Sequence, residues 1–342
     1  MTTKAFFLFP GQGAQSPGMA IDLLESSSAP AFADASAKKV KSLFSMASDI
    51  FGKDMADLLK NSSPETLKRT DISQPTITLA NLAAAAYLGA MPNSGKMLEQ
   101  AGCAGFSLGE YAALAVAGVI SEEDCFKLVT ERGKAMQVTS EKLAAAGAAP
   151  GMAAVMGLEP QKIEALIEEW KNSGINDLYA ANFNSSRQTV ISGTAEALTK
   201  AEKLFIEAGA KRCIRLQVAG PFHSPLMAES AEAFRPILEK VTFKDPVIPF
   251  YSNVSGKQVL TGDEAKKLAL LQITSPVRWT SEEAAIAASA AIPGAVGIDC
   301  LLELGPGKVL QGLWKDTGSV LPCHSAGTLT DIEKFLTEKG IN

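Results

Sequence analysis

Histidine and cysteine are scarce in this chain, and their spacing excludes the common metal sites. The 342 residues include two histidines, His223 and His324, and five widely separated cysteines. No C-x-x-C motif occurs, so neither a zinc site nor a framework of disulfides is indicated. We therefore expect no metal. An odd number of scattered thiols is typical of a reducing, cytoplasmic setting.

An excess of positive charge and long apolar runs are also missing. With 32 basic and 37 acidic residues the net charge is −5, which gives no general attraction to nucleic acid or to an anionic membrane. The longest apolar stretch, residues 79–91, is interrupted by Asn81 and is too short to span a bilayer. The first residues show no basic segment or cleavage pattern of a signal peptide. We expect no nucleic-acid and no membrane partner.

A G-x-S-x-G pattern is the feature around which the rest of the chain is organised. Gly105, Ser107 and Gly109 follow a short strand and precede the helix-compatible run 112–117. In a nucleophile elbow, a serine on a sharp strand-to-helix turn exposes its hydroxyl, and the first N–H groups of the helix point at its target. The alternative is a glycine-rich loop in which Ser107 caps a helix.

His223 is the better of two candidates for a base that would activate Ser107. Ser224 and Pro225 predict the N-cap and first residue of a helix running to about residue 240. The positive end of that helix disfavours an imidazolium and keeps the ring neutral, as a general base must be. His324 falls in a late polar loop. A purely structural role for His223 remains the alternative.

Arg132 is a candidate anion ligand. Ser121 predicts the N-cap of a helix from Glu122 to about residue 139, and Arg132 falls on its apolar stripe. An arginine directed inward needs an anionic partner. That partner is either an internal Asp or Glu, or a substrate carboxylate held by both arms of the guanidinium.

Three further segments provide candidate backbone groups and packing. The apolar strand 4–9 ends at a Gly11-Gln12-Gly13 turn, where the Gln12 N–H can face an oxyanion unless the turn is a plain connection. The next glycine, Gly18, comes two positions too late for a dinucleotide fingerprint. Pro75 predicts the start of a buried helix over 76–90. A helix over 263–272 would leave carbonyls free to accept from His223.

The middle of the chain has its own pattern of elements. Predicted strands and helices alternate as β-α-β-β-α-β, which is the ferredoxin-like split unit. The strands are expected at 152–156, 178–182, 188–192 and 212–218, and the helices at 160–172 and 195–208. We expect residues 141–217 to form a small subdomain inserted in a large one made of 1–140 and 218–342, with a cleft where they meet.

In order along the chain, these segments resemble the malonyl-CoA:acyl-carrier-protein transacylases and their acyltransferase-domain relatives. The resemblance covers nearly the whole chain and implies an α/β-hydrolase-like large subdomain with a ferredoxin-like insert. The matching segments are Phe9-Pro10-Gly11-Gln12-Gly13, Ser73-Gln74-Pro75, Gly105-x-Ser107-Leu108-Gly109-Glu110, Arg132-Gly133-Lys134-Ala135-Met136-Gln137, Gly151-Met152-Ala153-Ala154-Val155, Pro221-Phe222-His223-Ser224, Pro276-Val277-Arg278-Trp279 and Gly305-Pro306-Gly307-Lys308.

The resemblance implies a role for each candidate. Ser107 would be acylated by malonyl-CoA, His223 would act as base and then as acid, and Arg132 would bind the free carboxylate. The backbone would supply the rest: N–H groups of Gln12 and Leu108 as the oxyanion hole, and the carbonyl of Gln272 to orient His223.

The acyl pocket implied by the resemblance contains Phe222, Phe106, Gln74 and Met136. A phenylalanine at the position of Phe222 accompanies malonyl use, because a bulky ring fills the space that an α-methyl group needs. Phe106 departs from the pattern, since the family usually has histidine just before the nucleophile. We expect Phe106 to pack the elbow; the alternative is a slower or less selective enzyme.

The resemblance also implies partners. The substrates would be malonyl-CoA and holo acyl carrier protein, with no permanently bound cofactor, in a cytoplasmic monomer that supplies fatty-acid synthesis. An acidic carrier predicts a basic patch near the cleft, for which Arg187, Arg212 and Arg215 are candidates. Two rivals remain. A serine esterase or thioesterase requires a catalytic Asp or Glu, and a nucleotide-binding protein would use residues 11–18.

Overall fold

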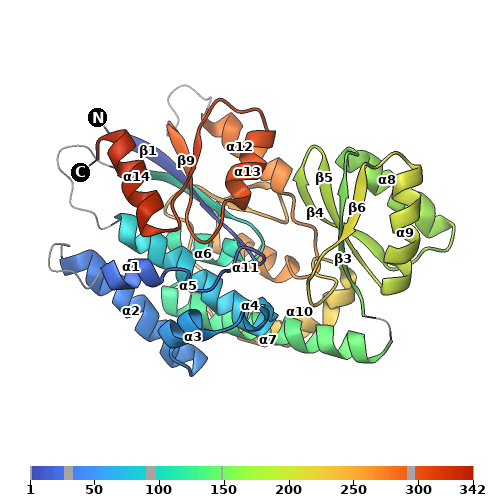
Figure 1. Cartoon of the computed structure of the whole chain (residues 1–342), viewed down its shortest axis with the longest axis horizontal. Helices are drawn as coiled ribbons and strands as arrows, with labels where there is room; N and C mark the ends of the chain where they lie inside the picture. The colour runs from blue at the N-terminus through green and yellow to red at the C-terminus, as the bar shows by residue number, and fades with distance from the viewer. Residues whose placement is uncertain (1, 27–33, 90–97, 148, 291–296, 342) are drawn as a thin grey trace.

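The computed structural model describes residues 2–26, 34–89, 98–147, 149–290 and 297–341. Within them, two β-sheets lie side by side, each covered by helices (Figure 1). The part that contains the larger sheet carries both ends of the chain, and the smaller sheet is formed by a continuous central stretch. The architecture is a mixed α/β fold with a largely parallel sheet. Among the described helices, none combines the length and apolar character needed to cross a membrane.

The larger sheet has six strands in the order β10-β9-β1-β2-β7-β8, of which β8 alone is antiparallel to its neighbour. Central strand β1 is buried on both faces: Ala5, Phe7 and Phe9 pack on one side, and Phe6 and Leu8 on the other. Burial of both faces explains its uninterrupted apolar sequence. The strands are β1 (Thr3–Phe9), β2 (Leu98–Gly105), β7 (Phe250–Ser252), β8 (Lys257–Val259), β9 (Cys300–Glu303) and β10 (Cys323–Ser325).

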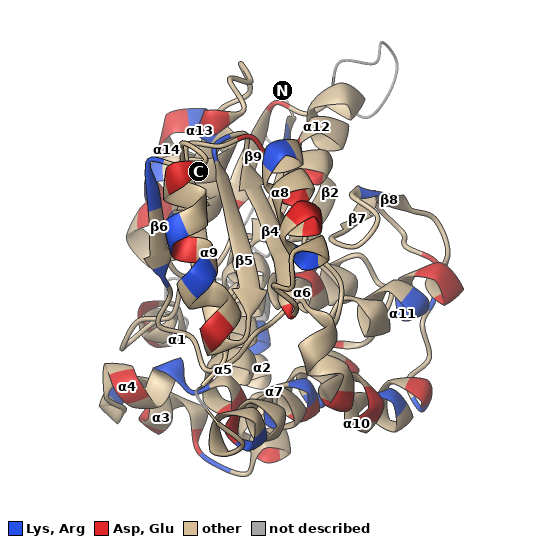
Figure 2. Cartoon of the chain, turned by 90° about the vertical axis from the view of Figure 1, so that its right-hand side faces the viewer, with Lys and Arg blue, Asp and Glu red and all other residues tan. Residues whose placement is uncertain are grey.

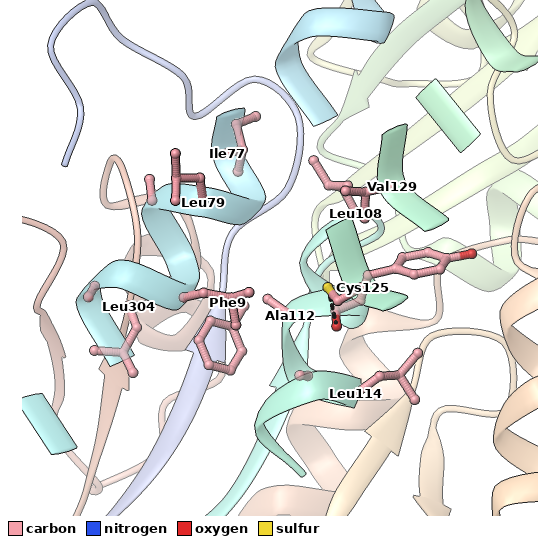
Figure 3. Packing of buried hydrophobic residues seen from close by; sticks show 14 of the residues in the cluster. Phe9, Ile77, Leu79, Leu108, Ala112, Leu114, Cys125, Val129 and Leu304 are labelled. Carbon is pink, nitrogen blue, oxygen red and sulfur yellow. Dashed lines mark hydrogen bonds between the residues drawn. The ribbon is translucent and has the colours of Figure 1, made fainter. Parts of the chain in front are cut away.

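Helices cover both faces of this sheet. On the first face, side chains of α5, α6 and α7 meet the end of β1 in one continuous core around Phe9, Leu108, Ala112 and Val129 (Figure 3). On the second face, Trp279 of α12 and helix α13 pack against β1. The helices of this part are α1 (Ile21–Ser26), α2 (Asp34–Phe51), α3 (Met55–Asn61), α4 (Pro64–Lys68), α5 (Thr70–Gly89), α6 (Gly109–Val116), α7 (Glu122–Ala145), α10 (Ala228–Glu239), α11 (Gly262–Leu271), α12 (Trp279–Ala290), α13 (Val309–Asp316) and α14 (Leu329–Lys339).

The smaller sheet is antiparallel, with the order β4-β5-β3-β6. Helices α8 and α9 share one core with it. Its backbone joins the larger part where the Phe183 N–H bonds the Val277 carbonyl and the Val277 N–H bonds the Ala181 carbonyl, at 2.9 and 2.8 Å. The elements are β3 (Gly151–Met156), α8 (Pro160–Asn172), β4 (Leu178–Ser185), β5 (Gln188–Gly193), α9 (Ala195–Glu207) and β6 (Arg212–Arg215).

The six elements predicted between residues 141 and 217 are all present, in the predicted order. The last strand is shorter than predicted, because β6 ends at Arg215 and the chain then turns toward the larger part. Ile214 is 46% exposed on this edge strand. Leu216 and Val218 instead line the cavity described below.

One predicted helix start is wrong, and a second is right in position but begins with a 3-10 turn. Pro75 lies inside α5, which begins at Thr70, and it lacks the N–H that would donate to the Asp71 carbonyl. The predicted end of that helix, residue 90, lies outside the described residues. After His223 the chain forms a short 3-10 turn, Pro225–Met227, and α10 begins at Ala228. Ser224 does not cap it, because its hydroxyl donates to the Pro221 carbonyl.

Candidate active site

The G-x-S-x-G segment forms a tight elbow between β2 and α6. Ser107 has φ of +50°, a left-handed conformation that is strained for a residue with a side chain. The two glycines are required by close approach. A Cβ on Gly105 would lie 2.1 Å from the backbone of Gly109, and a Cβ on Gly109 would lie 2.0 Å from the Phe9 carbonyl oxygen. The elbow therefore places Ser107 just before the start of a helix.

The Ser107 hydroxyl meets His223, as the sequence predicts. Ser107 Oγ lies 2.7 Å from His223 Nε2, and His223 Nδ1 lies 2.9 Å from the Gln272 carbonyl oxygen. A carbonyl can accept but not donate, so Nδ1 carries the proton and Nε2 is free to accept from Ser107. This is the hydrogen-bond arrangement of a nucleophile, its base and an orienting group.

The neutral state of His223 has a different cause from the predicted one. Burial, with the nearby positive charge of Arg132, lowers the pKa of His223 from 6.5 to about 4. The predicted helix dipole is not among the causes of this shift; the segment after His223 begins with the 3-10 turn at Pro225, and α10 follows at Ala228. The side chain remains a neutral base at pH 7.

The group that orients His223 distinguishes the site from a Ser-His-Asp hydrolase. In such a hydrolase, Nδ1 would meet a carboxylate. Here it meets the Gln272 carbonyl, and within the described ranges no carboxylate oxygen bonds the ring. The other histidine, His324, lies on edge strand β10 against Phe335, with ring centres 5.4 Å apart.

Arg132 is buried, with 1% of its surface exposed. Its Nη2 donates to Gln272 Oε1 at 3.0 Å, and the guanidinium lies 5.3 Å from the centre of the Tyr111 ring. Its Nε has no acceptor among the described residues, and no described Asp or Glu forms a salt bridge with it. Burial lowers its pKa, while nearby Glu110 opposes that effect. The guanidinium is thus a buried cation without a carboxylate partner.

A cavity of about 240 Å³ joins these groups. We call its two sides the elbow wall, which contains Gln12, Phe106, Ser107, Arg132, Met136 and His223, and the small-sheet wall, which contains Met152, Asn182, Asn184 and Val190. Phe222 also lines it. No group of His, Cys, Asp or Glu in the described part of the chain is arranged to hold a metal ion.

Gln74, predicted in the acyl pocket, is not among the residues that line the cavity. It lies one layer behind, where its Nε2 contacts Met136 Sδ at 3.3 Å. The Leu108 side chain also points away, into the core near Val129 (Figure 3). Leu108 can therefore contribute to the site only through its backbone N–H.

The two N–H groups predicted to stabilise an oxyanion are available. In the described structure neither the Gln12 nor the Leu108 N–H donates to a protein acceptor. The turn that carries Gln12 packs on the elbow, since a Cβ on Gly11 would lie 2.3 Å from the Phe106 carbonyl oxygen and 3.6 Å from the Leu108 nitrogen.

Three polar residues of the site, all asparagines, were missed by sequence reasoning. Asn253 Oδ1 accepts from the Ser107 N–H at 2.6 Å, and Asn253 N–H donates to Glu110 at 2.7 Å. Asn182 and Asn184 line the cavity, and each has an Oδ1 without a partner among the described residues. Asn253 could have been suspected because it follows β7, at the carboxyl edge of the parallel sheet where sites form. Nothing in a strand sequence marks Asn182 and Asn184.

Comparison with known proteins gives the class of this one. Residues 6–334 match the model of the acyl transferase domain family. The chain therefore belongs to the acyl transferase domain family, and it is an acyltransferase.

The relatives within that family narrow the activity. The malonyl CoA-acyl carrier protein transacylase of Escherichia coli (strain K12) is 36% identical over 313 residues, which are 92% of each protein. That of Bacillus subtilis (strain 168) is 35% identical over 92% of this chain and 90% of its own. Among solved structures, a type II PKS acyl-carrier protein in complex with its malonyl-transacylase matches with TM-score 0.84 and 30% identity over 98% of this chain and 100% of that chain. The malonyl-CoA:acyl carrier protein transacylase of Xanthomonas oryzae pv. oryzae matches with TM-score 0.82 and 33% identity over 99% of each chain.

Proposed function

We propose that this protein transfers the malonyl group of malonyl-CoA to the phosphopantetheine thiol of holo acyl carrier protein, and so supplies extender units for fatty-acid synthesis. One observation carries the proposal: Arg132, a buried cation without a carboxylate partner in the described structure, shares a cavity with Ser107 and His223. A short acyl group with a free carboxylate satisfies all three. The cavity, at about 240 Å³, is smaller than the roughly 300–1,000 Å³ of drug-sized ligand pockets, which suits such a group.

In the first half-reaction His223 Nε2 takes the proton from Ser107 Oγ as the oxygen attacks the thioester carbonyl. The N–H groups of Gln12 and Leu108 stabilise the oxyanion. The carbon–sulfur bond then breaks, and His223 returns the proton to the departing CoA sulfur. The product is a malonyl ester on Ser107.

In the second half-reaction the carrier's pantetheine thiol replaces CoA. It gives its proton to His223 and attacks the ester carbonyl, and Ser107 leaves with that proton. Each half uses the same base and the same oxyanion site, as a ping-pong mechanism requires. Arg132 selects dicarboxylic acyl groups, because a neutral acyl group would leave the buried guanidinium without an anionic partner. The chain's own residues suffice for these steps without a permanently bound cofactor.

The small-sheet wall is suited to the pantetheine arm that both substrates share. The arm carries amide N–H groups, and the partnerless oxygens of Asn182 and Asn184 are acceptors for them. The carrier protein itself would bind the outer surface of the smaller sheet, beside the cavity. Basic residues on β6 lie among residues of both signs there (Figure 2). Since Arg215 is paired with Glu202, we assign the exposed Arg187 and Arg212 to the carrier-binding patch.

The finer architecture belongs to the same proposal. Residues 1–140 and 218–342 form an α/β-hydrolase-like large subdomain, and residues 141–217 form a ferredoxin-like insert. The antiparallel order β4-β5-β3-β6 and the shared core of α8 and α9 support the insert. The enzyme acts as a monomer, because the described chain supplies both walls of the cavity itself.

The experiment is to incubate the protein with labelled malonyl-CoA, with and without holo acyl carrier protein, and to locate the label. We expect label on Ser107 that passes to the carrier. Ser107→Ala should abolish labelling, whereas Ser186→Ala, at an exposed serine of the β4–β5 turn, should not change it. Release of free malonate without transfer would support a thioesterase instead.

The same assay tests the choice between malonyl and methylmalonyl groups. Phe222 lines the cavity beside His223 and is 6% exposed, so its ring occupies space that an α-methyl group would need. Labelled methylmalonyl-CoA should therefore acylate Ser107 far more slowly than malonyl-CoA. Equal labelling by the two would contradict this assignment for Phe222.

A further inference from the structure

Gln272 contacts all three components of the site through separate atoms. Its backbone carbonyl accepts from His223 Nδ1 at 2.9 Å. Its side-chain Oε1 accepts from Arg132 Nη2 at 3.0 Å, and its Nε2 donates to the Ser107 carbonyl at 3.0 Å. The residue is fully buried at the end of α11. The mechanism above uses the backbone carbonyl alone, so the side chain has no assigned task.

The orientation of the Gln272 amide is fixed by its neighbours. Arginine has donors and no acceptor, so the amide oxygen must face Arg132. The Ser107 carbonyl and Asn253 Oδ1, 3.0 and 3.3 Å from Nε2, are acceptors, so the amide nitrogen must face them. Rotating the amide would break every one of these bonds. The guanidinium and the backbone of the nucleophile are therefore held at two ends of one rigid group.

A neutral amide has a specific consequence for a buried arginine. It accepts a hydrogen bond without cancelling the charge, and a charged carboxylate accepts about twice as strongly as a neutral group. Glu110 is the acid whose charge acts on Arg132, but in the described structure the two form no salt bridge, and burial raises the pKa of Glu110 to about 7. Arg132 thus keeps an unsatisfied preference for an anion.

We propose that the Gln272 side chain is a positioning residue that sets the preference for acyl groups with a free carboxylate. It holds the Arg132 guanidinium with a neutral acceptor at a fixed place relative to Ser107, so the charge stays available to the substrate. This inference rests on the proposed malonyl transfer and assigns part of its selectivity to a residue that does not line the cavity.

Two substitutions at this position are expected to change selectivity in opposite directions, while both keep the backbone carbonyl that orients His223. Gln272→Glu supplies an internal carboxylate to Arg132 and should lower the ratio of malonyl to acetyl transfer by about 100-fold, as for loss of a buried charge pair. Gln272→Met has similar length but only the weak acceptor of a thioether. The guanidinium then gains more from a substrate carboxylate, so the same ratio should rise several-fold.

The test measures kcat/KM for acylation of the full chain by malonyl-CoA and by acetyl-CoA in each variant. The ratio of two substrates in one preparation cancels any loss of folded protein. Gln137→Glu is the matched control: Gln137 is also nearly buried and lies on α7 with Arg132, but it bonds the Thr70 N–H instead. Its ratio should remain that of the wild type.

The inference is supported if the malonyl-to-acetyl ratio is lowest in Gln272→Glu, intermediate in the wild type and highest in Gln272→Met. Parallel loss of both activities in the two Gln272 variants, with an unchanged ratio, would show a structural role and overturn it. The wild-type arm tests the underlying function separately. A wild type that forms no malonyl-serine would refute the proposed transfer. If the wild type is malonylated but the Gln272 variants keep its malonyl-to-acetyl ratio, this inference alone is refuted.

Discussion

The nucleophile on the elbow wall and the two asparagines of the small-sheet wall differ in how completely their polar groups are paired. On the elbow wall, the N–H, carbonyl and hydroxyl of Ser107 meet Asn253, Gln272 and His223. On the small-sheet wall, the amide oxygens of Asn182 and Asn184 have no partner among the described residues. The nucleophile is thus held before any substrate arrives, whereas the small-sheet wall has buried acceptors without a partner among the described residues.

The pairing on the elbow wall compensates for backbone strain there. Ser107 and His223, with φ of +50° and +56°, both occupy the left-handed region. Such conformations persist where surrounding contacts hold them. Here the contacts are the hydrogen bonds of Asn253 and Gln272 to the Ser107 backbone, the bond of the Gln272 carbonyl to His223, and the apolar core around Leu108 and Phe9 (Figure 3). The reacting atoms are therefore fixed in position at 2.7 Å.

The largest effect is expected from removing the unpaired charge of the elbow wall. Arg132→Ala should lower kcat/KM for malonyl-CoA by about 100-fold or more, because the substrate carboxylate loses its buried partner. Acetyl-CoA should lose much less, so the relative tolerance of acetyl rises. Lys134→Ala is the control, since Lys134 is exposed on the same helix and pairs with Glu131. Equal losses for both substrates would show that Arg132 maintains structure and does not select.

The pH profile tests whether His223 is as deeply buried on the elbow wall as its geometry indicates. A base works when neutral, so kcat/KM falls as pH drops through its pKa, which here is about 4. Malonyl-serine formation should stay nearly level down to about pH 5, where an imidazole with an ordinary pKa near 6.5 would have lost about 30-fold. A midpoint near the ordinary value would contradict the burial. Recovery of activity on return to neutral pH is the control for unfolding.

The fold was predictable where one local signal dominates. The β-α-β-β-α-β order of the smaller sheet follows from periodicity and turns, and Ser121 marks the start of α7 through its bond to the Asp124 N–H. The prediction from Pro75 was wrong because this proline lies inside the helix, at the cost of one backbone hydrogen bond, and not at its first residue. Ser224 stands at the predicted N-cap position, but its hydroxyl donates to the Pro221 carbonyl and makes no capping bond.

The site was predictable in its chemistry but not in its support. Ser107, His223 and Arg132 carry distinctive side chains in distinctive contexts, and the structure brings them into one cavity. Asn253 and the Gln272 side chain act through contacts between segments far apart in the chain, which no local pattern encodes. The cause of the neutral His223 is likewise a property of burial, which depends on the whole fold.

On the small-sheet wall a smaller effect is expected, because a neutral hydrogen bond is weaker than a buried charge pair. Asn182→Ala removes an acceptor for the pantetheine arm and should raise KM several-fold for malonyl-CoA and for the carrier alike, with little change in kcat. Asn172→Ala, at the exposed end of α8, should change neither. A change confined to one of the two substrates would show that Asn182 contacts a part of it outside the shared arm.

The smallest effect is expected at Phe106, which lines the elbow wall without a polar atom. Its ring meets Trp279 edge-on, with centres 5.4 Å apart, and Trp279 is itself fixed by a bond to Glu283. Because the Ser107–His223 contact does not involve Phe106, Phe106→His should change malonyl-serine formation by less than about threefold while weakening the ring contact by about 0.5–1.5 kcal/mol. Thermal unfolding measures the second quantity, and Phe106→Leu controls for loss of the aromatic ring. A rate increase of tenfold or more in Phe106→His, absent in Phe106→Leu, would contradict this expectation. It would show that a polar side chain at this position assists the chemistry, and that the elbow wall of this enzyme lacks that group.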